Sequence, residues 1–85
     1  MKHAGPDARA ALEPLLAELR LRAALREKRP GVFYLKSRAF LHFHEDPKGL
    51  FADVRLADDF VRRPVSTNRQ RAALLRAVDR LLADH

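Results

Sequence analysis

The stretch from Ala39 to Leu56 constrains the fold of this chain more than any other part of the sequence. Residues 39–45 and 50–56 largely alternate apolar and polar side chains, which is the pattern of half-buried strands. Between them, Asp46-Pro47-Lys48-Gly49 has the aspartate, proline and glycine that a type I turn favours at its first, second and fourth positions. The stretch therefore predicts an antiparallel hairpin.

The two faces of this hairpin differ in chemistry if Glu45 pairs with Leu50. One face is then apolar and holds Leu41, Phe43, Leu50, Ala52, Val54 and Leu56. The other face holds Phe40, His42, His44, Phe51, Asp53 and Arg55. A bulge at Gly49 would shift the register by one residue and mix the two sets, because side chains alternate along a strand.

Helices are expected on both sides of the strands. Apolar residues recur at helical spacing after Asp7, so we expect a helix over about residues 8–28, ended by Pro30. Thr67 and Gln70 have the spacing of a capping box, which predicts a second helix over about 67–83. Residues 32–36 should form a further strand, residues 58–65 a linker, and residues 1–6 a disordered end.

These elements predict a single α+β domain over residues 1–85 with αβββα order. Short connections favour a three-stranded antiparallel meander, with strands at about 32–36, 39–45 and 50–56. Both helices have an apolar stripe, so they should pack on the Leu41 and Phe43 face of the sheet. The opposite face, with its histidines, would then be open.

Composition narrows the function classes. The chain has no cysteine, no apolar run long enough for a membrane span and no signal-peptide core, so we expect a cytoplasmic protein without a membrane partner. Its three glycines stand apart, which argues against a phosphate-binding loop. No serine or threonine lies in a nucleophile motif, so we expect neither an enzyme nor a bound cofactor.

The residues that point most directly to chemistry are His42, His44 and Asp53. The two histidines project from the same side of one strand, and Asp53 lies across the hairpin from His42. Two imidazoles and a carboxylate suit zinc, iron or nickel. In the alternative interpretation these are ordinary polar residues of a solvent-facing surface, with Asp53 paired to His42 or Arg55.

The formal net charge of +6 raises the possibility of nucleic-acid binding. This charge is uneven, because residues 1–38 and 62–85 are basic whereas residues 39–61 are acidic. Binding would therefore use the basic helical surface, whose candidate residues are Arg62, Arg63, Arg69, Arg76 and Arg80. The alternative is a solvated helix face in an arginine-rich chain.

Our leading functional prediction is a small non-enzymatic protein that acts through association with a protein partner or with a second copy. It rests on apolar residues expected outside the core, namely Leu21, Leu25, Phe40 and Phe51. A homodimer would bury such surfaces. Nucleic-acid binding and the metal site at the hairpin are the alternatives.

The hairpin also carries a resemblance. The segments Phe40-Leu41-His42-Phe43-His44-Glu45-Asp46 and Gly49-Leu50-Phe51-Ala52-Asp53-Val54-Arg55 resemble small bacterial proteins of uncharacterised function with a helix, a three-stranded sheet and a helix. The resemblance covers roughly residues 30–82. It implies this fold and carries no activity, cofactor or site residue.

Overall fold

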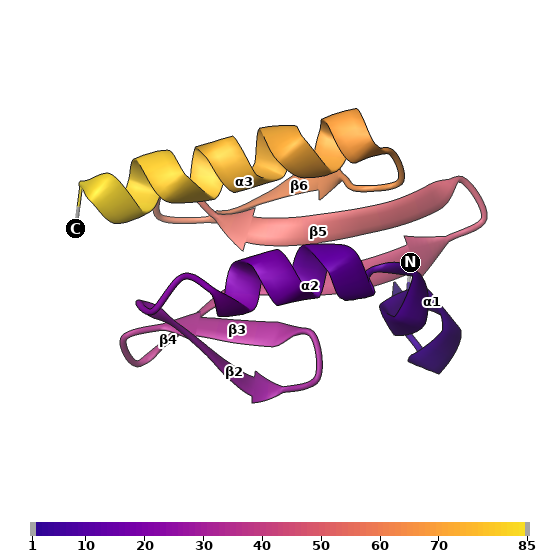
Figure 1. Cartoon of the computed structure of the whole chain (residues 1–85), viewed down its shortest axis with the longest axis horizontal. Coiled ribbons are helices and arrows are strands. Elements are labelled where there is room, and N and C mark those ends of the chain that lie inside the picture. The colour runs from indigo at the N-terminus through magenta and orange to yellow at the C-terminus, as the bar shows by residue number, and fades with distance from the viewer. Residues whose placement is uncertain (1, 85) are drawn as a thin grey trace.

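The computed structural model describes residues 2–84, which form one sheet with helices on one of its faces (Figure 1). The strands are β1 Lys2–His3, β2 Leu25–Arg29, β3 Val32–Leu35, β4 Arg38–Asp46, β5 Gly49–Arg55 and β6 Phe60–Pro64. The helices are α1 Pro6–Ala11, α2 Glu13–Arg20 and α3 Asn68–Ala83. Strands β2 to β6 form an antiparallel meander, and β1 pairs with β4. The predicted α+β class is confirmed, but the sheet has six strands instead of three.

The central hairpin has the expected register. Glu45 pairs with Leu50 and Leu41 pairs with Val54, so Gly49 introduces no shift between β4 and β5. From Leu41 to Val54, side chains of this hairpin therefore separate into an apolar face and a polar face, as the alternation predicted.

The apolar face of the sheet and the two longer helices share one core. Leu12, which lies between α1 and α2, is fully buried, as are Leu41 of β4 and Val78 of α3. The same cluster also contains Leu15, Leu16, Leu19, Leu25, Phe33, Leu35, Phe40, Phe43, Ala52, Val54, Val65 and Leu74. Because α2 and α3 both pack against this face (Figure 1), they do not cover the opposite one, which we call the outer face.

The expected helix over residues 8–28 is wrong. It is replaced by α1 and α2, which meet at Leu12, and by strand β2. Pro14 has no N–H to continue the first helix, but it fits the first turn of α2, where no helical hydrogen bond is lost. Residues 25–29 have good helix propensity, and pairing with β3 overrides it.

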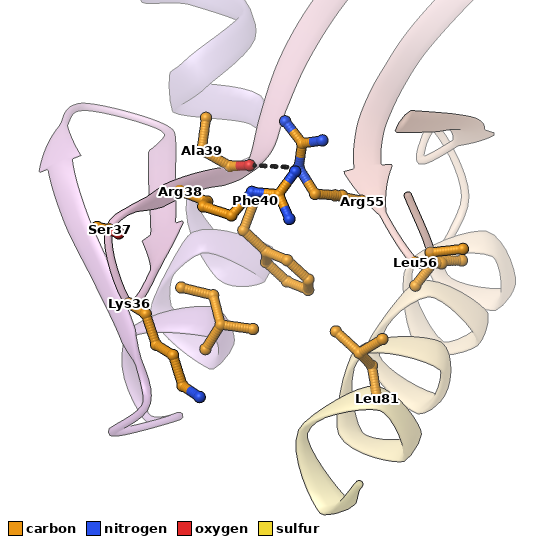
Figure 2. A pocket seen from close by; sticks show the side chains of 10 residues that line it. Lys36, Ser37, Arg38, Ala39, Phe40, Arg55, Leu56 and Leu81 are labelled. Carbon is orange, nitrogen blue, oxygen red and sulfur yellow. Dashed lines mark hydrogen bonds between the residues drawn. The ribbon is translucent and has the colours of Figure 1, made fainter. Parts of the chain in front are cut away.

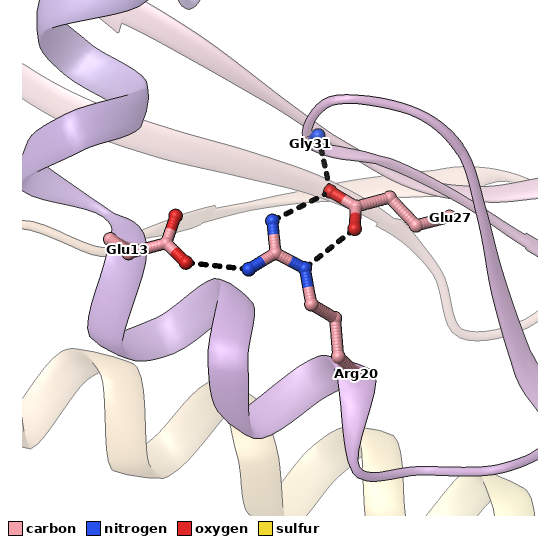
Figure 3. Close-up of polar contacts among 4 residues, drawn as sticks. All are labelled: Glu13, Arg20, Glu27 and Gly31. Carbon is pink, nitrogen blue, oxygen red and sulfur yellow. Dashed lines mark hydrogen bonds and ion pairs between the residues drawn. The ribbon is translucent and has the colours of Figure 1, made fainter.

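A polar cluster joins α2 to β2 (Figure 3). The guanidinium of Arg20 donates to Glu13 on its own helix and to Glu27 on β2. Glu27 also accepts a hydrogen bond of 2.9 Å from the backbone N–H of Gly31. These bonds to Arg20 and Gly31 hold the pKa of Glu27 below its usual value. The edge strand β2 is thus held against α2 by the ion pair of Glu27 with Arg20 as well as by burial of Leu25.

Two further expectations about chain organisation are wrong. Residues 58–65 are not all linker, because Phe60–Pro64 form β6, the edge strand of the sheet that pairs with β5. The first residues are not all disordered, because Lys2 and His3 pair with β4. Met1 lies outside the described residues. β1 depends on pairing with a distant segment, which local sequence patterns do not report. β6 directly follows β5, but it lacks the alternating pattern that reveals a half-buried strand.

The last helix agrees with its prediction. Thr67 is the N-cap, its hydroxyl accepts from the N–H of Gln70 at 3.1 Å, and the Gln70 side chain accepts from the N–H of Thr67 at 3.0 Å. Within residues 2–84, no helix has the length and apolar character needed to cross a membrane.

A bulge in β4 moves Phe40 into the core. Leu41 pairs with Phe33 and Ala39 pairs with Tyr34, so Phe40 has no partner across the strands. Its ring is only 2% exposed and borders an apolar pocket of about 310 Å³ near Leu81 of α3 (Figure 2). The expectation that Phe40 lies on the outer face is therefore wrong.

Candidate metal centre

Three histidines from two strands meet on the outer face of the sheet. His42 and His44 alternate along β4, on the side opposite the buried Leu41 and Phe43. Strand β1 adds the third, because His3 is the direct partner of His44 across the β1–β4 pair. We refer to His3, His42 and His44 as the histidine cluster.

The three rings are close together. Ring centroids are 4.9 Å apart for His3 and His44, 4.9 Å for His42 and His44, and 5.9 Å for His3 and His42. One ring nitrogen from each residue can be chosen so that the three atoms lie within 4.8 Å of one another. Such a triangle is close enough to converge on a single ion if the cluster contracts.

Several nitrogens of the histidine cluster are buried without a hydrogen bond. These are Nδ1 of His42 and both ring nitrogens of His44. The Nε2 atom of His44 lies 2.9 Å from Oδ2 of Asp53, but the two groups do not have hydrogen-bond geometry. Buried polar atoms are normally paired, and a neutral imidazole has one nitrogen with a lone pair, so each of these two rings can offer one lone pair to a ligand.

Asp53 stands behind His44 and is held by Arg62 of β6. The guanidinium donates from Nε to Oδ1 and from Nη2 to Oδ2, both at 2.8 Å. This paired interaction is the main reason that the pKa of Asp53 lies below its usual value. Asp53 thus stays ionised, with one oxygen beside the imidazole of His44.

The surroundings of His42 favour its neutral form. Burial, together with the nearby His44, keeps the pKa of His42 below its usual value of 6.5, although Asp53 acts in the opposite direction. Part of this burial comes from Phe60, whose ring centroid is 5.0 Å from that of His42. The ring of Phe60 is in turn covered by the guanidinium of Arg55 at 4.3 Å. A neutral imidazole can donate its lone pair to a metal.

The sequence located part of this arrangement. His42, His44 and Asp53 do lie together on the outer face, and Asp53 pairs with His42 in the strand register. His3 was missed because nothing in its local sequence shows that it pairs with His44. Arg62 was considered only as a contact for nucleic acid, whereas it binds both oxygens of Asp53.

The arginines predicted to bind nucleic acid do not form one surface. Arg62 points to the outer face with Asp53, and Arg63 follows it on the other side of β6. Arg69, Arg76 and Arg80 are exposed on α3, which packs on the opposite face of the sheet from the histidine cluster.

The four residues predicted for association do not share one surface either. Leu21 is 74% exposed after the end of α2, and Phe51 is half-buried on the outer face. Leu25 and Phe40 belong to the core, so the expectation that they are exposed is wrong.

In comparisons with known proteins, no family model, curated protein or solved structure matches this chain.

Proposed function

We propose that this protein binds a transition-metal ion, with Zn²⁺ as the best candidate, through the histidine cluster on the outer face. The observation that carries the proposal is the convergence of His3, His42 and His44, with ring nitrogens within 4.8 Å of one another. Imidazole nitrogen is a preferred ligand of zinc, and sets of three histidines are known zinc sites.

Unpartnered nitrogens support this proposal. A buried polar atom without a hydrogen bond loses its interaction with water and gains nothing in return. Nδ1 of His42 and Nδ1 of His44 are in this position. Coordination of a metal would use both lone pairs. It would therefore offset the cost of burying these polar rings, which apolar side chains at the same positions would not incur.

Asp53 acts as a positioning residue in this proposal. Metal-binding histidines commonly donate their second ring N–H to a carboxylate, which fixes the tautomer and orientation of the ring. Oδ2 of Asp53 lies 2.9 Å from Nε2 of His44. A small rotation of the ring would complete this hydrogen bond and direct Nδ1 of His44 toward the ion. Asp53 is not a ligand itself, because Arg62 binds both of its oxygens.

The ion would require the cluster to contract. In a tetrahedral zinc site with bonds of about 2.1 Å, ligand nitrogens are about 3.4 Å apart. His42 and His44 are fixed on the long strand β4, whereas His3 is exposed on the two-residue strand β1. Movement of His3 therefore closes the site. Three protein ligands leave a fourth position for water or another small ligand.

A zinc titration of the full chain, followed by calorimetry and by the imidazole NMR signals, tests the proposal. We expect one zinc ion per chain and shifts of the ring signals of His3, His42 and His44. His42→Asn and His3→Asn should weaken binding by more than the roughly 10–100-fold expected for Asp53→Asn, which removes only an outer partner.

Two substitutions of the same chemical kind serve as controls. His85→Asn removes the remaining histidine of the chain, and Asp59→Asn removes an exposed carboxylate away from the cluster. Both should bind zinc like the wild type. Equal affinity in His42→Asn and the wild type, or unchanged ring signals on addition of zinc, would show that the proposal is wrong.

A further inference from the structure

A pocket opens beside the histidine cluster, where one edge of β4 is shared by two strands. β3 pairs with β4 from Arg38 to Leu41, and β1 pairs with it at His44 and Glu45. Between the two, the N–H of Ala4 donates to the carbonyl of Phe43 at 3.1 Å. The cavity at this gap has a volume of about 420 Å³, which is within the range of small-molecule sites.

The lining of this pocket combines an apolar wall with basic and polar groups. The wall includes Val32 and Phe43. The polar groups are His3 and His42 of the histidine cluster, Tyr34, Arg9 and Arg29. No aspartate or glutamate is among the described residues that line it. The pocket is therefore suited to an anionic ligand with an apolar part.

Both arginines have guanidinium groups available for such a ligand. Within residues 2–84, neither Arg9 nor Arg29 forms an ion pair with a carboxylate. Arg9 donates one N–H to the carbonyl of Ala4 at 3.2 Å. Its aliphatic part passes the backbone of Gly31, where an added Cβ would lie 3.6 Å from Cδ of Arg9. These two contacts hold Arg9 in the pocket and leave most of its five N–H donors unused.

We propose that this pocket binds a small organic carboxylate, with the carboxylate on Arg9 and Arg29 and the apolar body against Val32 and Phe43. Guanidinium groups bind carboxylates through paired, charge-assisted hydrogen bonds. His3 and His42 border the same space, so a bound ligand would lie next to two of the proposed metal ligands. Coupling to the metal rests on the proposed function, whereas binding to the arginines does not.

The test uses benzoate as the probe and follows the NMR signals of the full chain, first without metal. We expect saturable shifts of the Nε–Hε signal of Arg9 and of the backbone amides of Gly31 and Val32. Benzyl alcohol has a similar ring without the charge and should produce no such shifts. Arg9→Gln and Arg29→Gln should each weaken benzoate binding by about tenfold or more, because each removes charged hydrogen bonds.

The control for net charge is Arg76→Gln, which removes an exposed arginine on α3, on the other face of the sheet. It should bind benzoate like the wild type. Equal shifts with benzyl alcohol, or unchanged affinity in both pocket variants, would overturn the proposal. Tighter binding of inorganic phosphate than of benzoate would also overturn it and identify a phosphate site instead.

A second titration with zinc-loaded protein separates this proposal from the metal site. We expect zinc to tighten benzoate binding and benzoate to tighten zinc binding by the same factor, because the two effects are thermodynamically linked. Benzoate binding without any zinc binding would leave the anion pocket in place and refute the metal function. Zinc binding without benzoate binding would refute the pocket alone.

Discussion

Asp53 is 8% exposed and interacts with two side chains of different character. Arg62 supplies a full positive charge through two hydrogen bonds, and His44 places a polarisable ring at 2.9 Å from the same carboxylate. Since Arg62 keeps Asp53 ionised, the carboxylate can accept an N–H from His44 at neutral pH. The charge of Asp53 in this part of the outer face therefore depends on Arg62 of β6.

The lowered pKa of His42 predicts how stability changes with pH in the metal-free protein. Between its folded-state pKa and the usual value near 6.5, the unfolded chain binds a proton at His42 that the folded chain does not. The free energy of unfolding should therefore fall as pH decreases from about 7 to 5. Urea unfolding at a series of pH values measures this slope.

His42→Asn is the variant that checks the assignment of this slope. Glu27, Glu45, Asp53 and Asp79 also have lowered pKa values, but they titrate below the range used. The variant should show a smaller loss of stability between pH 7 and 5 than the wild type. Equal slopes in the two proteins would mean that His42 does not control this range.

Local patterns revealed the residues of the site that belong to one hairpin. Alternation along β4 and β5 was enough to place His42, His44 and Asp53 on one face. His3 belongs to a strand that pairs with a distant segment, and Arg62 belongs to the short strand β6, which directly follows β5 but has no alternating pattern of its own. Their roles depend on tertiary contacts, so the sequence alone could not reveal them.

At the level of elements, the β4 bulge decides which aromatic residue stabilises the core. Strict alternation would place Phe40 with His42 and Phe51 on the outer face. The extra residue in β4 instead places Phe40 beside Leu41 on the apolar face. Arg55 supports the strand there, because its Nε donates to the carbonyl of Ala39 at 3.0 Å (Figure 2).

Substitution of the two phenylalanines tests this difference. Phe40→Ala should lower the free energy of unfolding by about 3–5 kcal/mol, the usual loss for a fully buried phenylalanine. Phe51→Ala should cost clearly less, because Phe51 is half-buried on the outer face. Urea unfolding of both variants gives the comparison. Equal losses would contradict the bulge as described.

The elements that were predicted well are those stabilised by short-range signals. The turn at Asp46–Gly49 fixes the hairpin, and the capping box at Thr67 fixes the start of α3. Residues 25–29 lack such a signal. Their charged side chains suit a solvent-exposed helix and an edge strand equally well, and the contacts of Glu27 with Arg20 favour the strand.

For the molecule as a whole, placing both long helices on one face leaves the outer face free for function. Exposed arginines of α3 lie on the helical side, whereas the histidine cluster and its neighbouring pocket lie at the outer face and the β4 edge. Nucleic-acid binding through Arg69, Arg76 and Arg80 of α3 and metal binding, two of the three functions predicted from sequence, therefore concern different surfaces and can be tested by separate substitutions. Arg62 is the exception, because it lies beside the histidine cluster and binds Asp53.

Metal binding should also connect the beginning of the chain to the sheet. β1 is attached by the ion pair of Lys2 with Glu45, by the hydrogen bond from Gly5 to Glu45, and by the bond from Ala4 to Phe43. The first two contacts share the carboxylate of Glu45, and β1 is only two residues long, so few contacts hold this strand. A metal bonded to His3 on β1 and to two residues of β4 would add a strong link.

We therefore expect zinc to raise the melting temperature of the wild type and to slow amide exchange at Ala4. A ligand at about 100 times its dissociation constant stabilises the folded state by about 2.7 kcal/mol, which corresponds to roughly 10–20 °C for a domain of this size. In His3→Asn, β4 keeps its two histidines, but the link to β1 is lost. An equal rise in His3→Asn and the wild type would show that zinc acts elsewhere on the chain, whereas a rise confined to proteins that keep His3 would follow from a metal that joins β1 to β4.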